Sequence, residues 1–344
     1  MATTQFGTMP DGTPVWLCEL KNGNGLSAEV LTYGATIHRL RVPDRKGKAA
    51  DVVLGRADLA GYQAPGTPAA AAIGRVANRI RNHTFNLNGR RYTLDANERK
   101  TTLHGGSGNY AHKNFALVDA TDRLVRLAVR DHGEGGFPGE VAVEVCYSLD
   151  DDNALLIEYT AVPTEDTPVN LTNHVYFNLA GQGSGPVDKQ ILQIAADFYT
   201  PADARDIPTG EVAKTRGTPL DFTRPQKLGD ALAELAAWGD RHGGFDHNFV
   251  LNGCGWRKIS TAEDEASGRV METYTDLPGV QLYTANGIRA GSVGKDGAAY
   301  EAHGGFCLET QFFPDTIHKP HFPDCVVAAD EVFATSTAYR FLTR

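Results

Sequence analysis

Short runs in which apolar and polar residues alternate are the feature that most constrains the fold of this chain. Val141 to Tyr147 alternates with a period of two, as does Leu155 to Ala161, and the turn-forming stretch 150–153 (DDDN) separates them. A period of two places successive side chains on opposite faces of a strand, so these runs predict a hairpin. The same alternation is found in 124–130, 306–313 and 331–341.

The runs are separated at short intervals by glycine and proline, which number 37 and 17 in the 344 residues. Many short strands between such turns predict an all-β sandwich or barrel. Leucines at helical spacing in the alanine-rich segment Lys227 to Trp238 predict one helix, and we expect a short helical turn near Ala69 to Val76. No repeat or linker interrupts the pattern, so we expect a single domain over residues 1–344.

The composition argues against several classes of partner and location. The formal charge is −9 and no basic stripe is present, which argues against a nucleic-acid partner. The five cysteines are odd in number and form no CxxC pair, so we expect reduced thiols and a cytoplasmic location. Residues 1–10 do not read as a signal peptide, and no run approaches the ~20 apolar residues of a membrane span.

Polar residues gather in five segments near predicted strand ends or in loops. They are 74–80 (GRVANRI), 103–106 (LHGG), 172–179 (TNHVYFNL), 245–249 (FDHNF) and 306–315 (FCLETQFFPD). If 172–179 is a strand, Thr172, His174, Tyr176 and Asn178 share one face, which is polar enough to line a sugar cleft. Glu309 lies within an apolar run, where a carboxylate is costly to bury unless it is paired or functional.

Each of these residues also has a purely structural interpretation. His174 alone is explained by a hydrogen-bonded structural role, and Glu309 by half of an ion pair. Arg75 and Arg79 would then be a solvated pair, and 246–248 a capped turn. The remaining histidines are expected to be loop residues that contact no ligand; they are His112, His132, His242, His303, His318 and His321.

Several motifs of other enzyme classes are missing. The sequence contains no GxSxG, HExxH or Walker motif. The segment 23–28 (GNGLSA) loosely matches a dinucleotide-binding pattern, but no βαβ context surrounds it, and we interpret it as a turn.

Taken in order, GRVANRI, LHGG, TNHVYFNL, FDHNF, QLYTANG and GFCLETQFFPD closely resemble the galactose mutarotase (aldose 1-epimerase) family over nearly the whole chain. The resemblance implies a large, mostly antiparallel β-sandwich with few short helices. It also implies an enzyme that interconverts the α and β anomers of a free aldose such as galactose or glucose. A monosaccharide would be its partner, and it would need no cofactor and no metal.

The resemblance also implies roles for individual residues. Glu309 matches the family's general base, His174 its general acid, and His104 a second histidine near the sugar ring oxygen. The residues expected to hold the sugar are Arg79, Asn78, Asp246 and Gln281. Segment 285–289 departs from the usual family pattern, and we expect it to affect the rim of the cleft.

The implied chemistry needs one base and one acid at the anomeric centre. Opening a cyclic aldose removes the proton of the anomeric hydroxyl and adds one to the ring oxygen. We expect partial desolvation to raise the pKa of Glu309, and its carboxylate to keep His174 charged. Tyr176 and Phe313 are the aromatic candidates for stacking on the sugar.

Three rival functions remain open at this stage. A glycoside hydrolase would use Asp246 and Glu309 as its carboxylate pair and would leave the histidines without a task. A sugar-binding protein of the same fold would bind without catalysis. An epimerase of phosphorylated hexoses would bind the phosphate through Arg75 and Arg79. The sequence shows no wider basic pocket for such a group.

Overall fold

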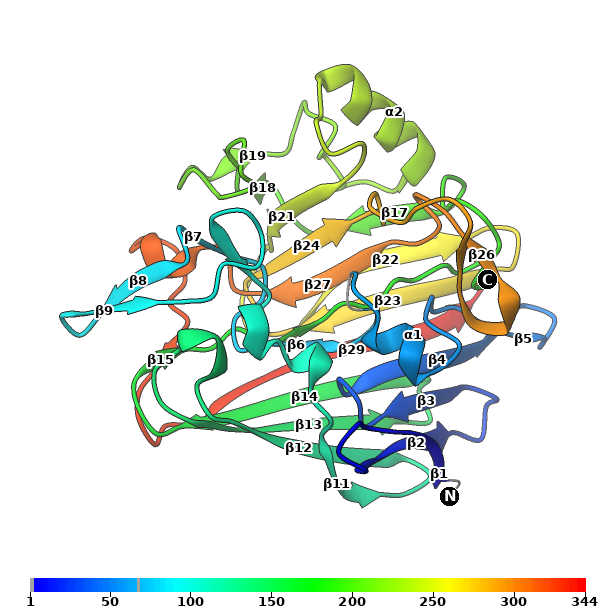
Figure 1. Cartoon of the computed structure of the whole chain (residues 1–344). Helices are drawn as coiled ribbons and strands as arrows, with labels where there is room; N and C mark the ends of the chain where they lie inside the picture. Colours follow the sequence, from blue (N-terminus) through cyan, green and yellow to red (C-terminus); the bar gives the residue numbers. More distant parts are fainter. Residues whose placement is uncertain (1–2, 67–68) are drawn as a thin grey trace.

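The computed structural model of the chain describes residues 3–66 and 69–344, and antiparallel β-sheets make up most of it (Figure 1). The largest sheet has nine strands in the order β11-β12-β13-β14-β29-β23-β22-β17-β20. Their bounds are β11 (Ala116–Ala120), β12 (Leu124–Asp131), β13 (Val141–Leu149), β14 (Ala154–Pro163), β29 (Phe333–Thr343), β23 (Arg269–Thr275), β22 (Arg257–Asp264), β17 (Ile191–Ile194) and β20 (Gln226–Lys227).

A five-stranded sheet in the order β19-β18-β21-β24-β27 contains several of the predicted site segments. Its strands are β19 (Ala213–Lys214), β18 (Phe198–Tyr199), β21 (Asp246–Val250), β24 (Gly279–Tyr283) and β27 (Cys307–Gln311). The amino-terminal strands form another sheet of five: β1 (Thr3–Thr8), β2 (Pro14–Lys21), β3 (Ser27–Leu31), β4 (Thr36–Pro43) and β5 (Ala49–Asp51).

Short strand pairs complete the β-structure. They are β6 (Ala72–Ile73) with β16 (Thr172–Asn173), β7 (Arg79–Arg81) with β10 (Thr101–Leu103), β8 (Thr84–Leu87) with β9 (Arg90–Thr93), β15 (Thr167–Pro168) with β28 (Val326–Val327), and β25 (Ser292–Val293) with β26 (Ala299–Tyr300). The described residues also include two α-helices, α1 (Leu59–Gln63) and α2 (Leu228–Trp238), and single turns of 3₁₀-helix at η1 (Gly106–Gly108), η2 (Tyr110–His112), η3 (Glu134–Gly136), η4 (Lys295–Gly297) and η5 (Thr316–His318).

The structure confirms the predicted all-β class, the hairpin and the main helix. Strands β13 and β14 pair antiparallel from Val141 with Pro163 to Leu149 with Leu155. Helix α2 ends at Trp238, where Gly239 adopts a left-handed conformation that suits glycine. The helical turn expected at Ala69 to Val76 is wrong, because Ala72 and Ile73 pair with β16 instead. Tertiary pairing here overrides the helix preference of the alanines.

One apolar core lies between the sheets and supports the strands that carry the site. Val145 and Tyr339 of the nine-stranded sheet, Ile37 of the amino-terminal sheet, and Val280 and Leu308 of the third sheet all belong to it. Burial of this continuous apolar area is the main favourable term in folding. Strands β24 and β27 therefore rest with one face on the core and turn the other toward the site.

Arg75 is a structural residue, which contradicts the interpretation of Arg75 and Arg79 as a solvated pair. Its guanidinium is fully buried and donates to Asp131 at 2.9 Å, to the carbonyl of Gly139 at 3.0 Å and to Thr167 at 3.0 Å. Tyr110 donates a further bond to the same carboxylate at 2.8 Å. A guanidinium that is buried and saturated in this way is not available to a ligand.

We predict that Arg75→Ala lowers the free energy of unfolding by about 3–5 kcal/mol, because it leaves the Asp131 carboxylate buried without its partner. Arg130 is the matched control, since its side chain is 57% exposed and that of its partner Glu140 45% exposed. Arg130→Ala should change the unfolding free energy by less than about 1 kcal/mol. Urea denaturation measures both; similar costs for the two variants would contradict this account.

Candidate active site

Backbone pairing brings the predicted acid and base together. Phe177 and Phe306 form an antiparallel bridge, with N–H to carbonyl distances of 2.8 and 2.9 Å. The bridge is isolated, and beyond it the backbone of His174 bonds to Ala70 and Ala71 at 2.8 and 3.0 Å. Three residues from the bridge on each segment, His174 Nε2 lies 3.6 Å from Glu309 Oε1.

His104 completes the cluster from a different loop. Its ring centroid is 5.5 Å from that of His174, and its Nδ1 accepts the backbone N–H of Asn78 at 3.2 Å. Because Nδ1 is an acceptor, the neutral ring carries its proton on Nε2 and is a donor there. His104, His174 and Glu309 are 9%, 3% and 2% exposed, so all three are largely withdrawn from water.

The two glycines after His104 are required by the backbone. His104 itself has φ of 54°, and Gly105 and Gly106 have φ of 85° and 68°. A Cβ on Gly105 would collide with the carbonyl of Gly74. The LHGG motif thus forms a tight turn packed against the segment before Arg75, and this turn sets the position of the imidazole.

Burial shifts the pKa values of Glu309, His174 and His104. Burial and the nearby Asp246 raise the pKa of Glu309 well above its usual value, despite Arg79. Burial lowers the pKa of His174 to about 4, and burial with His174 and Arg79 lowers that of His104 far below its usual value. The expected rise for Glu309 is confirmed. The expectation that His174 is charged is wrong, because desolvation disfavours the imidazolium.

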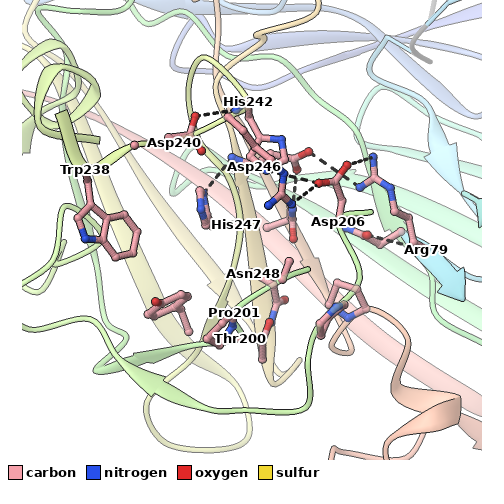
Figure 2. A pocket seen from close by; sticks show the side chains of 18 residues that line it. Arg79, Thr200, Pro201, Asp206, Trp238, Asp240, His242, Asp246, His247 and Asn248 are labelled. Atoms are coloured by element: carbon pink, nitrogen blue, oxygen red, sulfur yellow. Dashed lines mark hydrogen bonds and ion pairs between the residues drawn. The ribbon is translucent and has the colours of Figure 1, made fainter. Parts of the chain in front are cut away.

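The predicted sugar-binding residues line one cleft, of about 280 Å³. Arg79, Asn78, Asp246 and Gln281 all border it, and Figure 2 shows Arg79 near one end and Trp238 near the other. Gln281 donates to Asp246 at 2.6 Å and lies opposite Glu309 in the β24–β27 register. His104, His174 and Glu309 do not line this cleft themselves. They adjoin it because Asn78, which bonds to His104, and Gln281, which lies opposite Glu309, are lining residues.

Arg79 is held by carboxylates on more than one side. It donates to Glu98 through Nε at 2.6 Å and Nη2 at 2.9 Å, and it lies 3.9 Å from Asp246 and 3.8 Å from Asp206. The forked pair with Glu98 fixes the orientation of the guanidinium. Asp246 begins β21, so the interpretation of 246–248 as a capped turn is wrong.

The sequence missed several residues of the cleft. Asp206 lies between Arg79 and His242 (Figure 2) and accepts from Arg241 at 2.7 Å; its carboxylate is also 3.4 Å from His242. His242 was expected to be a loop residue without a role in binding, and it lines the cleft, as does His247. These loops have no periodic pattern, so only tertiary structure reveals their convergence.

Tyr176 and Phe313, the predicted stacking aromatics, do not line this cleft. Tyr176 packs on His174 with centroids 4.9 Å apart, and Phe313 packs on Phe322, while Tyr199 and Trp238 are the aromatic residues of the cleft. Asn178 does not face the site, because its amide donates to the carbonyls of Gly185 and Gly304. The predicted strand 172–179 is regular only at β16.

Segment 285–289 does not line the cleft that Arg79 and Asp246 border. Gly287, Ile288 and Arg289 line a second cavity of about 470 Å³, together with Tyr176 and Arg56. Because Tyr176 also packs on His174, the expectation that this segment affects the rim of the sugar site stays a prediction.

His104, His174 and Glu309 also have the composition of a metal site. Within the described ranges they are the one group of three potential ligands, with atoms within 4.8 Å of one another. A zinc ion would need an unprotonated nitrogen from each histidine at about 2.0–2.1 Å. The hydrogen bond from Asn78 to His104 Nδ1 instead leaves the proton on Nε2. The geometry fits hydrogen bonding to a polar ligand better than metal coordination.

Comparison with known proteins identifies the family. A model of the family described as aldose 1-epimerase matches residues 17–340. The chain belongs to the aldose 1-epimerase family. It is therefore an enzyme of the class of epimerases that act on carbohydrates, which confirms the class predicted from the sequence.

Relatives and solved structures agree over the full length. The galactose mutarotase of Bos taurus is 42% identical over 342 residues, covering 98% of this chain and 97% of its own. The aldose 1-epimerase of Escherichia coli K12 is 35% identical over 340 residues, with 97% of each chain covered. The crystal structure of a GalM/aldose epimerase homologue from C. elegans superposes with a TM-score of 0.88 at 29% identity, covering 95% of this chain and 98% of the other.

Across residues 3–66 and 69–344, no helix is long and apolar enough to cross a bilayer.

We predict that Gly105→Ala destabilises the protein by at least about 2 kcal/mol, because it combines an unfavourable positive φ with a backbone collision. Gly217 is the matched control, since its φ is 80° and a Cβ there would meet nothing within 4 Å. Gly217→Ala should cost only about 1 kcal/mol. The measurement is the unfolding free energy in urea, and equal costs for both variants would contradict the role of the Gly74 contact.

Proposed function

We propose that this enzyme is an aldose 1-epimerase that interconverts the α and β anomers of a free hexose by acid–base ring opening and closure. The proposal rests on one observation: a buried carboxyl and a buried imidazole, Glu309 and His174, face each other at 3.6 Å beside a polar cleft. Relatives that bear the names galactose mutarotase and aldose 1-epimerase support galactose, or another aldose, as the substrate.

The two shifted groups are best treated as a pair that holds one proton. The raised pKa of Glu309 and the lowered pKa of His174 favour the form with this proton on the carboxyl. Transfer from Oε1 to Nε2 creates a carboxylate and an imidazolium without any exchange with solvent. Polar hydroxyls of a bound sugar would favour the charged form, because they replace part of the lost hydration.

The charged pair then performs the reaction. The Glu309 carboxylate takes the proton of the anomeric hydroxyl while the His174 imidazolium protonates the ring oxygen, and the bond from ring oxygen to anomeric carbon breaks. Glu309 Oε2 is buried and has no hydrogen-bond partner among the described groups, which suits an acceptor for the anomeric hydroxyl. Rotation about the bond between carbons 1 and 2, followed by the reverse transfers, gives the other anomer.

The surrounding residues would hold the substrate. His104 offers its Nε2–H as a neutral donor near the ring oxygen, and Arg79 offers donors that Glu98 already orients. Asp246 and Gln281 add acceptors and donors for hydroxyl groups. None of these steps requires a cofactor, because no electrons and no phosphoryl group are transferred.

The rival functions have less support. The family is one of epimerases, so neither a glycoside hydrolase based on Asp246 and Glu309 nor a non-catalytic binding protein is favoured. A phosphohexose epimerase using Arg75 and Arg79 is disfavoured by geometry. Arg75 is buried and saturated by Asp131 and its other partners, and the carboxylates of Asp206 and Asp246 near Arg79 would repel a phosphate.

We predict that Glu309→Gln and His174→Asn each lower kcat by at least about 10²-fold, as expected for loss of a general base or acid. Polarimetry of freshly dissolved α-glucose and α-galactose measures the rate after subtraction of the spontaneous reaction. The exposed residues Glu158 and His132 supply controls, and Glu158→Gln and His132→Asn should leave kcat unchanged. Near-normal turnover of either active-site variant would refute the assignment.

The shared proton also predicts the pH dependence. Acidification adds a second proton to the pair only near the His174 pKa of about 4, and alkali removes the shared proton above the raised pKa of Glu309. We therefore expect kcat/KM to fall on the acid side only below about pH 5.5, and to fall in alkali where the raised pKa of Glu309 is passed. Stopped-flow polarimetry in buffers of constant ionic strength tests this, and an acid limb centred near 6.5 would contradict it.

A further inference from the structure

Both nitrogens of His174 are contacted by side chains of one strand. Cys307 and Glu309 are two residues apart on β27, so they project from the same face. Glu309 Oε1 lies 3.6 Å from Nε2 of His174, and Cys307 Sγ lies 3.5 Å from Nδ1. The thiol therefore touches the proposed acid on the side away from the reacting proton.

The imidazole is held in this orientation from several directions. The Tyr176 ring packs on it at 4.9 Å with an interplanar angle of 31°, and the Tyr283 ring meets it at 5.9 Å and 80°. Cys307 lies opposite Tyr283 in the β24–β27 register and is fully buried. The contact between sulfur and Nδ1 is thus part of the packed interior and is closed to solvent.

The sulfur is a neutral thiol in this environment. Burial, with Glu309 and Asp246 nearby, raises the pKa of Cys307 well above its usual value. A thiol is a weak donor and a weak acceptor, so it can pair with either tautomer of a neutral imidazole. The tautomer decides which nitrogen has a lone pair for the proton of Glu309.

We propose that Cys307 is a positioning residue for the epimerase reaction, whose sulfur accepts the Nδ1–H of His174 and so leaves Nε2 to exchange a proton with Glu309. This inference rests on the function proposed above. With Nδ1 protonated throughout, the transfer breaks only the Oε1–H bond and forms only the Nε2–H bond. If the thiol instead donated to Nδ1, the neutral ring would carry a proton on Nε2 and could not accept another there.

Kinetics of two variants test this role. Cys307→Val replaces the hydrogen-bonding sulfur by two methyl groups in a slightly larger side chain, and Cys307→Ser keeps an acceptor. We expect Cys307→Val to lower kcat about three- to tenfold, the range of one net hydrogen bond, with KM within about twofold. Cys307→Ser should remain within about threefold of the parent. The control Cys18→Val changes another fully buried cysteine, which lies in β2 of the amino-terminal sheet, and should leave kcat unchanged.

The pattern of these rates decides the outcome. Parental kcat in a folded Cys307→Val variant, or equal losses for the valine and serine variants, would overturn the role of the sulfur. Thermal unfolding of each variant separates a loss of folded protein from a change in turnover.

The tautomer can be observed without any variant or activity. Nitrogen-15 NMR of the imidazole of His174 in the parent protein, assigned by its loss in His174→Asn, reports which nitrogen carries the proton. We expect the proton on Nδ1 at neutral pH, and a proton on Nε2 alone would overturn the proposal. If the parent protein fails to accelerate anomer exchange, the proposed function fails, whereas this measurement still tests the contact between Cys307 and His174.

Discussion

The backbone bridge between Phe177 and Phe306 is the contact on which the site depends. It joins two segments far apart in sequence and brings His174 opposite Glu309. The core-facing side of β27 is also held in place, because Tyr339 of the nine-stranded sheet donates to the carbonyl of Leu308 and to Asn173. The distance between the proposed acid and base is therefore set by sheet register and core packing, which are stiffer than any loop.

Burial gives this pair its chemistry at a cost in folding free energy. An unpaired carboxylate or imidazolium in this interior would be strongly disfavoured, and the mechanism proposed above avoids both by keeping a single proton on the two groups. The charged form is then reached by moving that proton over a short distance.

The sequence was most informative where periodicity is strong. Alternation predicted β12, β13, β14, β27 and β29 because a strand with one buried face must alternate, and leucine spacing predicted α2. The proposed catalytic residues came from the motifs of the family resemblance, supported by the cost of placing Glu309 in an apolar run.

The roles of residues that are set by long-range contacts could not be predicted from sequence periodicity. Asp206 and His242 lie on loops without periodicity. Only the folded chain brings them within 3.4 Å of each other and places Asp206 beside Arg79 and Arg241. Arg75 and Arg79 look alike in sequence, and only Asp131 and the surrounding carbonyls show that the first is structural. Ala69 to Val76 has helical composition, yet the available partner strand decided its conformation.

The network around the cleft has a consequence for affinity. Arg79, Asp206, Arg241, Asp246 and Gln281 already form hydrogen bonds or ion pairs with one another. An incoming hydroxyl group must compete with these partners, so each new hydrogen bond brings a small net gain. Such a site should hold its substrate weakly and release either anomer quickly, which suits a reaction whose two ends differ at only one carbon.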